Sequence, residues 1–112
     1  MSDVAHKKDF NALLLAQTES EAPSRPLVVK FSAPWCAPCK AYAPIFDRVA
    51  EANEGADFLT IDTEEDPALS QRLGVRGLPT TQVWVDGELR AQRVGLLMSA
   101  DLSRLLSEAC EA

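Results

Sequence analysis

The sequence predicts an α/β fold, in which one central mixed sheet is flanked by helices on both faces. Two observations carry this prediction. Segments with helical spacing of apolar residues alternate with short β-branched runs, and two strand-like segments are joined by Asp86-Gly87, a strong hairpin signal. The predicted order is helix, strand, helix, strand, helix, hairpin, helix. A chain of 112 residues is long enough to bury one core, so we expect a single domain over residues 1–112.

Composition narrows the functional classes. Hydrophobic residues make up 46% and charged residues 25% of the chain, as in ordinary globular proteins. The net charge of −6 argues against a nucleic-acid partner, which requires clustered Lys and Arg. The apolar runs are too short to span a bilayer, and the charged N-terminal segment has no signal-peptide core. We therefore expect a cytoplasmic monomer that binds neither membrane nor nucleic acid.

The first two elements are a helix and a buried strand. Phe10, Leu13, Leu14 and Gln17 fall on helical spacing, which predicts a helix of about three turns that ends before a polar loop at residues 18–26. The run at 27–31 is β-branched and apolar, as in a strand buried on both faces. Lys30 is the one charged residue in that run.

A second helix should follow Cys36. Its apolar positions are Ala41, Tyr42, Ile45, Phe46, Val49 and Ala50. Pro44 should kink this helix, because proline removes an amide and crowds the preceding turn. Gly55 should mark its end.

The remaining elements have clear boundaries. Residues 58–62 alternate as a half-buried strand, and Asp66-Pro67 opens a helix that runs to about Leu73 and is closed by Gly74. Residues 80–85 and 88–94 form the predicted hairpin. Ser99 or Asp101 opens a last helix with one apolar stripe. The stripe is Leu102, Leu105, Leu106 and Ala109.

The segment Trp35-Cys36-Ala37-Pro38-Cys39-Lys40 carries most of the functional information. Two thiols three positions apart can close a small disulfide, and a helix N-terminus favours the thiolate of the first. A Cys-x-x-Cys pair alone is a weak signal, because it is also half of a zinc site. Three cysteines and one histidine, His6, do not supply a convincing tetrahedral set, so we expect no metal.

Further motifs stand in a fixed order around this pair. They are Phe31 before Ala33-Pro34-Trp35, then Pro44, Asp66-Pro67, residues 74–80 (Gly-Val-Arg-Gly-Leu-Pro-Thr), Asp86-Gly87-Glu88 and Val94-Gly95. With this ordered set the chain resembles a thioredoxin over nearly its whole length. The resemblance implies the thioredoxin fold and a protein disulfide reductase in which the cysteines carry the electrons, with no bound cofactor.

The resemblance also implies roles for the residues of the cysteine box. Cys36, at the helix N-cap and toward solvent, is the attacking thiol, and Cys39, one turn in, is the resolving thiol. Pro38 fixes the backbone of the first turn. Trp35 shapes the docking surface and should also pack partly into the core.

A second group of residues is implied to form the substrate site. Pro79 resembles the family's cis-proline, which lies against the disulfide. Gly77, Leu78 and Gly95 would line the peptide groove, with Leu78 offering main-chain hydrogen bonds to an extended substrate. For the two glycines, a role in backbone geometry alone is an equal alternative.

Two departures from the family pattern concern the surroundings of the thiols. Thioredoxins usually carry a buried Asp where this chain has Lys30, and the usual lysine partner is replaced by Thr60. Lys30 could be neutral and act as a base, could be charged and favour a thiolate, or could extend its amine to solvent and do neither. If it is charged, the redox potential should be less reducing than that of an ordinary thioredoxin. Ser32 replaces an aromatic residue and should make the site wetter.

Several alternatives stay open at this point. The expected partners are disulfide-containing protein substrates and a thioredoxin reductase or other dithiol donor. The alternatives to a reductase are a thioredoxin-like adaptor or co-chaperone with weak redox activity, and a disulfide oxidase or isomerase. Cys110 is interpreted as a partly buried apolar residue, although a regulatory or dimer-forming thiol is the other possibility.

Overall fold

A computed structural model describes residues 7–19 and 25–111. The helices are α1 (Lys7–Glu19), α2 (Ala37–Ala52), α3 (Pro67–Arg72) and α4 (Ser99–Glu111), and the strands are β1 (Leu27–Ser32), β2 (Asp57–Asp62), β3 (Thr80–Val85) and β4 (Glu88–Val94). The predicted order of elements is confirmed. None of the helices in the described part of the chain is long and apolar enough to cross a membrane.

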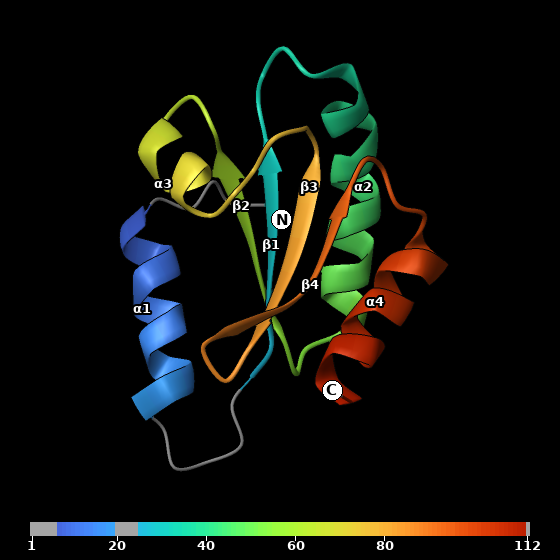
Figure 1. Cartoon of the computed structure of the whole chain (residues 1–112). Helices are drawn as coiled ribbons and strands as arrows, with labels where there is room; N and C mark the ends of the chain where they lie inside the picture. The colour runs from blue at the N-terminus through green and yellow to red at the C-terminus, as the bar shows by residue number, and fades with distance from the viewer. Residues whose placement is uncertain (1–6, 20–24, 112) are drawn as a thin grey trace.

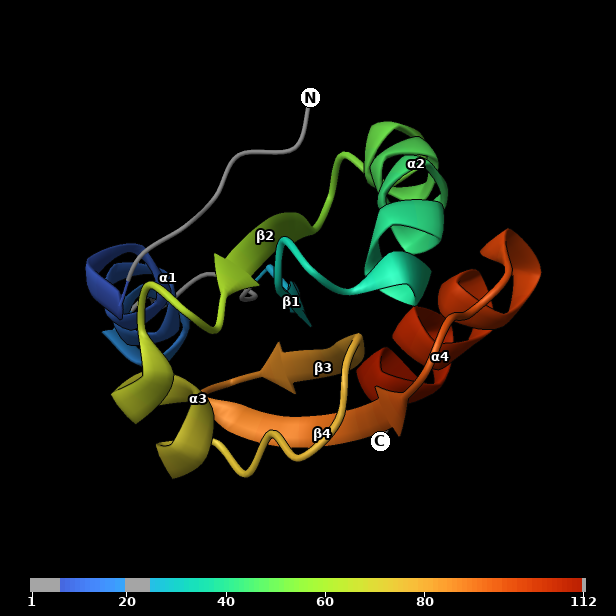
Figure 2. The same cartoon turned by 90° about the horizontal axis from the view of Figure 1, so that it is seen from above.

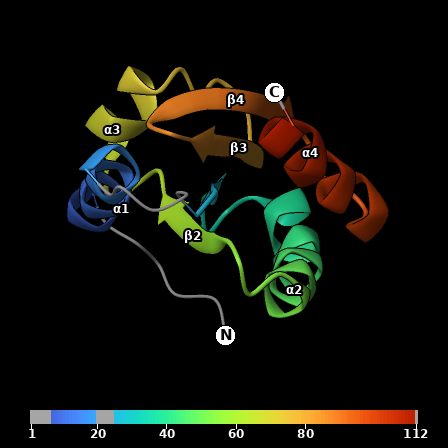
Figure 3. The same ribbon diagram turned by 90° about the horizontal axis from the view of Figure 1, so that it is seen from below.

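The four strands form one mixed sheet in the order β2-β1-β3-β4. β1 runs parallel to β2 and antiparallel to β3, and β3 runs antiparallel to β4. Helices α1 and α3 cover one face of the sheet, and α2 and α4 cover the other (Figures 1, 2 and 3). The predicted α/β class with helices on both faces is therefore confirmed.

Alternation along the strands produces two cores. Val28 and Val83 face α2 and α4, where they join the predicted apolar stripe of α4. Leu27, Val29 and Phe31 face α1 and α3 and pack with Phe10. β1 is thus buried on both faces, as predicted. Lys30 shares the α2 face with Val28, and its lateral neighbours are Thr60 on β2 and Thr81 on β3.

The turns follow their local chemistry. Asp86 (φ 55°) and Gly87 (φ 79°) both have positive φ, the geometry of a tight hairpin turn. At the start of α3, Asp66 Oδ1 accepts the Leu69 amide at 3.2 Å, and Gly74 (φ 77°) follows the helix. Both predictions are confirmed.

Two helix ends differ from the prediction. α1 continues to Glu19 instead of ending before Thr18, because Gln17 Nε2 donates to the Trp84 carbonyl at 2.8 Å and holds this end of the helix on the hairpin. α2 ends at Ala52, earlier than Gly55, because Asn53 takes the cap and its Nδ2 donates to the Val49 carbonyl. Pro44 lies inside α2, and the kink there stays a prediction.

Candidate active site

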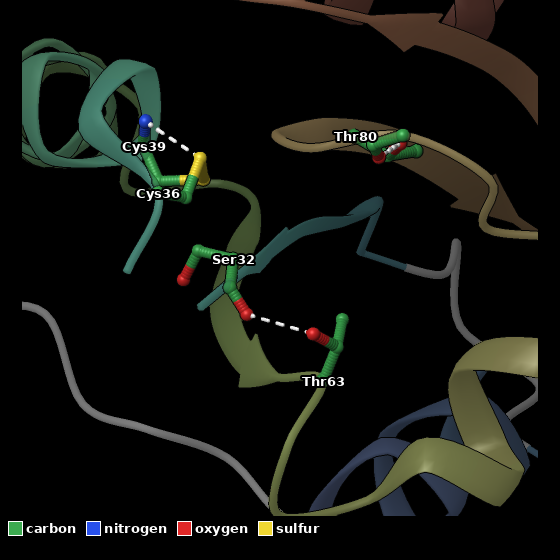
Figure 4. The surroundings of a disulfide bond; sticks show 6 residues. Ser32, Cys36, Cys39, Thr63 and Thr80 are labelled. Atoms are coloured by element: carbon green, nitrogen blue, oxygen red, sulfur yellow. Dashed lines mark hydrogen bonds between the residues drawn. A yellow bond between two sulfur atoms is a disulfide. The ribbon is translucent and has the colours of Figure 1, made fainter. Parts of the chain in front are cut away.

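Cys36 and Cys39 form a disulfide at the start of α2, with their Cα atoms 5.2 Å apart (Figure 4). Cys36 is the N-cap residue, in extended conformation, and its Sγ accepts the Cys39 amide at 3.2 Å. Amides at a helix N-terminus lack helical partners and carry the positive end of the helix dipole. In the reduced protein, both effects favour the thiolate of Cys36.

The residues between the cysteines fit this geometry. Pro38 occupies the first turn of α2, where a missing amide breaks no helical hydrogen bond. Two backbone hydrogen bonds hold the N-cap residue. The Cys36 amide donates to the Ala33 carbonyl at 3.1 Å, and the Lys40 amide donates to the Cys36 carbonyl at 3.3 Å. Cys36 is thus held by its own backbone before any substrate arrives.

The disulfide is less accessible than the sequence predicted. Cys36 and Cys39 are each only 4% exposed, because Ala33 and Leu78 pack against them. The prediction that Cys36 faces solvent is therefore wrong for this oxidised state. Cys36 does line a neighbouring groove, whereas Cys39 does not. Cys36 is therefore the cysteine of the pair that faces the groove.

The groove has a volume of about 590 Å³ and runs between the cysteine turn, α3 and the segment before β3. Trp35 and Pro38 line it from the cysteine turn, and Val75 and Leu78 line it from the segment before β3. Trp35 is 68% exposed. The expectation that it also packs into the core is wrong, because it lies in the turn before α2, outside the contact of the helix with the sheet.

The bond between Leu78 and Pro79 is cis, as expected. Gly77 and Leu78 line the groove, whereas Pro79 is buried and is not among the lining residues. Gly95 also lies outside the lining, and its amide donates to the Pro79 carbonyl at 2.7 Å. Its φ of 105° is open to glycine but strained for other residues. Gly95 therefore holds the Pro79 loop in place through its backbone.

Lys30 is 2% exposed, and its Nζ lies 4.9 Å from the centre of the Phe46 ring. Burial lowers the pKa of the amine, while the Asp47 carboxylate raises it in part. The alternative in which the side chain extends into solvent is contradicted by this burial. Phe46 follows Cys39 by two helical turns, so the backbones of these two residues are about 10 Å apart along the helix axis.

A buried pair of hydroxyl groups, which sequence reasoning missed, joins α2 to β3. Its helix member, Tyr42, lies between Cys39 and Phe46. Tyr42 Oη and Thr81 Oγ1 are 2.7 Å apart, and both residues are fully buried. Burial raises the pKa of Tyr42 to about 12, although the hydrogen bond to Thr81 opposes this rise. Tyr42 had been assigned only to the apolar face of α2. The position of Thr81 beside Lys30 follows from strand register, which the sequence does not show.

Other polar groups near the site have plain structural roles. The Ser32 carbonyl accepts both the amide and the hydroxyl of Thr63, at 2.9 and 3.3 Å, and so closes the end of β2 (Figure 4). Thr60 is buried beside Lys30. Ser32 itself is only half-buried, and its effect on the wetness of the site stays a prediction.

The remaining candidates lie elsewhere. Cys110 is an exposed free thiol on α4, although partial burial of its side chain raises the pKa of that thiol. Cys110 is therefore more exposed than its interpretation as a partly buried apolar residue implies, because it lies beside the apolar stripe of α4 and not within it. His6 falls outside the described residues. Within the described ranges, no cluster of His, Cys, Asp and Glu could hold a metal ion.

Comparison with known proteins gives one consistent result. The family model described as Thioredoxin matches residues 3–108. A thioredoxin of Acidithiobacillus ferridurans is 37% identical over 93 residues, which are 80% of this chain and 84% of that protein. A thioredoxin of Mycoplasmoides gallisepticum is 29% identical over 106 residues, 95% of this chain and 99% of that protein.

Solved structures agree on the fold. The thioredoxin of Fasciola hepatica superimposes with a TM-score of 0.83 at 23% identity, covering 97% of this chain and 99% of that one. At this level of identity the likeness concerns the arrangement of helices and strands. It places the mixed sheet and its flanking helices in the thioredoxin fold.

Proposed function

The chain belongs to the thioredoxin family, and we propose that it reduces protein disulfides through an attack by Cys36 that is resolved by Cys39. The chemical class itself follows from the family and from the Cys36–Cys39 pair: the protein is a thiol-disulfide oxidoreductase of the protein disulfide reductase type. The observation that carries the assignment of roles is that Cys36 is both the helix N-cap and the cysteine that lines the groove.

In the first step, the Cys36 thiolate attacks one sulfur of a substrate disulfide. The substrate S–S bond breaks, a mixed disulfide forms between Cys36 and the substrate, and the other substrate sulfur leaves as a thiolate that takes up a proton. The helix N-terminus stabilises the attacking thiolate. The groove holds the flanking polypeptide so that its sulfur reaches Cys36.

In the second step, the Cys39 thiolate attacks Cys36 Sγ. The mixed disulfide breaks, the second substrate thiolate leaves and is protonated, and the Cys36–Cys39 disulfide seen in the structure forms. Two electrons have then passed from the dithiol to the substrate. An external dithiol donor, such as a thioredoxin reductase, must return them.

The alternative functions are not favoured. An adaptor needs the fold but not the pair, whereas here the pair, the proline between its cysteines and the cis peptide before Pro79 are all present. An oxidase or isomerase would use the same residues. The relatives that match most of the chain are thioredoxins, which favours the reductase.

Lys30 is proposed as a modulator of the redox potential. Its amine packs on Phe46, two helical turns beyond Cys39, and a charged amine at about 10 Å stabilises a thiolate by about 1–2 kcal/mol at an effective dielectric constant of about 20. For a two-electron couple this corresponds to about 20–40 mV. The sign is toward a less reducing potential, because the reduced form carries the thiolate.

The cellular setting is part of the proposal. We place the protein in the cytoplasm, acting as a monomer on protein disulfides. The unpaired third cysteine, Cys110, supports a reducing compartment, because cysteine thiols are kept reduced in the cytosol. A monomer leaves the groove beside Cys36 open to a polypeptide.

A trapping experiment tests the assignment of roles. Cys39→Ser should accumulate a mixed disulfide between Cys36 and a model disulfide protein, visible as a mass adduct that dithiothreitol removes. The matched variant Cys36→Ser should form no such adduct, with Cys110→Ser present in both variants so that this exposed thiol cannot react. Adducts of equal yield on both variants would overturn the assignment.

A further inference from the structure

The groove beside Cys36 contains a single charge. The side chains that line it are apolar or uncharged polar groups, with the exception of Arg76. Arg76 directly precedes Gly77 and Leu78, which also line the groove. Any polypeptide in contact with this segment therefore lies beside one guanidinium group and no lining carboxylate.

Arg76 has no partner among the described residues, as Arg72 has none, but of these two arginines only Arg76 lines the groove. Arg25, Arg90 and Arg104 each form an ion pair with an aspartate, at 3.2, 3.4 and 3.4 Å. The exposed Arg76 side chain makes neither a hydrogen bond nor an ion pair with any residue in the described ranges 7–19 and 25–111. Its five donors are thus available to a ligand in the groove.

We propose that Arg76 makes this groove selective for polypeptide disulfides that carry an acidic side chain two residues from the reacting cysteine. The inference rests on the proposed function and names its preferred substrate class. A carboxylate can take a bidentate, charge-assisted pair of hydrogen bonds from a guanidinium. In an extended peptide, side chains two residues apart point to the same face and lie about 7 Å apart, so a side chain two residues from the cysteine at Cys36 faces the groove.

The net charge of the chain is negative, so an acidic substrate is attracted only at short range, inside the groove. With a net charge of −6, the protein repels an acidic substrate at long range. Attraction must therefore come from the groove itself, over distances shorter than the Debye length. The preference should be modest, about 1.5- to 5-fold, because exposed ion pairs contribute about 0.2–1 kcal/mol.

The test compares three disulfide-linked peptides that differ only in the residue two positions from the cysteine, which is Glu, Gln or Lys. The reduced protein should reduce the Glu peptide about 1.5- to 5-fold faster than the Gln peptide in kcat/KM, and the Lys peptide more slowly. Arg76→Gln should remove the preference, Arg76→Glu should reverse it, and Arg76→Lys should retain much of it. Raising the salt concentration should shrink the Glu-to-Gln ratio of the wild-type protein.

Arg72→Gln is the matched control. Arg72 is another exposed arginine, at the end of α3, and does not line the groove. Its removal changes the net charge by the same amount and should leave the Glu-to-Gln ratio unchanged. A ratio that falls equally in both variants would overturn the proposal, since it would assign the preference to net charge.

The outcomes separate this inference from the proposed function. Equal reduction of all three peptides by the wild-type protein, or a preference that survives in Arg76→Gln, overturns the selectivity and leaves the reductase intact. A wild-type protein that reduces none of the peptides, and no protein disulfide either, contradicts the proposed function itself.

Discussion

The hydroxyl groups of Tyr42 and Thr81 lie 2.7 Å apart and join α2 to β3 one helical turn after Cys39. One residue belongs to the helix that carries both cysteines, and the other to the strand that follows Pro79. The bond thus connects the two segments that meet at the disulfide.

Loss of this bond should cost stability. Tyr42→Phe removes one hydroxyl and leaves the Thr81 hydroxyl buried without its partner, so we expect a loss of about 1–3 kcal/mol in the free energy of unfolding, measured by urea denaturation. Thr81→Val in the Tyr42→Phe background should recover part of that loss, because no buried hydroxyl then remains. Strictly additive losses in the double-mutant cycle would contradict the coupling.

Burial of the Tyr42 hydroxyl predicts a pH dependence of stability on the alkaline side. Because the native pKa of Tyr42 is about 12, above its ordinary value of 10.0, the unfolded chain loses this proton first. The Tyr42 contribution to stability should be complete below pH 10.0 and should fall as the pH rises toward 12. Tyr42→Phe should flatten this part of the curve, and an unchanged slope would contradict the assignment.

Lys30 should destabilise the fold when it is charged. Its native pKa is lowered by burial, so between that lowered pKa and 10.5 the unfolded chain binds more protons, and stability should rise with pH in this window. Lys30→Met removes the buried charge and should raise the free energy of unfolding at neutral pH by up to about 1–4 kcal/mol. A loss of stability in Lys30→Met would contradict this prediction, because it would mean that the charged amine stabilises the folded protein.

Lys30 should also set the redox potential. Lys30→Met should make the potential of the Cys36–Cys39 pair more negative by about 20–40 mV, measured by equilibrium with a glutathione or dithiothreitol buffer. Lys30→Asp should make the redox potential still more negative. Lys30→Arg keeps the positive charge and should have the redox potential of the wild-type protein. A wild-type potential equal to or more negative than about −270 mV, and unchanged in Lys30→Asp, would contradict the proposed role.

Cys110 should be separate from the chemistry. An alkylating reagent should modify Cys110 alone in the oxidised protein and all three cysteines after reduction. Alkylation of Cys110 at neutral pH should be slow, because its thiol pKa is raised. Cys110→Ser should keep full reductase activity, and a disulfide-linked dimer on a non-reducing gel of the wild-type protein would contradict the proposed monomer.

The sequence predicted what depends on local chemistry. Asp86-Gly87 and Asp66-Pro67 placed the hairpin and α3 correctly, because turn and cap residues act on their own backbone. Contacts between segments that are distant in the sequence could not be predicted. The burial of Cys36 depends on Leu78, and the pairing of Tyr42 with Thr81 depends on strand register. Lys30 was singled out correctly as unusual, but the direction of its amine toward Phe46 is set by packing across the sheet.

The most direct test of the central claim is reduction of insulin disulfides with dithiothreitol or a thioredoxin reductase as electron donor. We expect the wild-type protein to accelerate the reaction and Cys36→Ser to abolish the acceleration while keeping the native circular dichroism spectrum. Acceleration that survives in Cys36→Ser, or a folded wild-type protein that gives none with either donor, would contradict a reductase that works through Cys36.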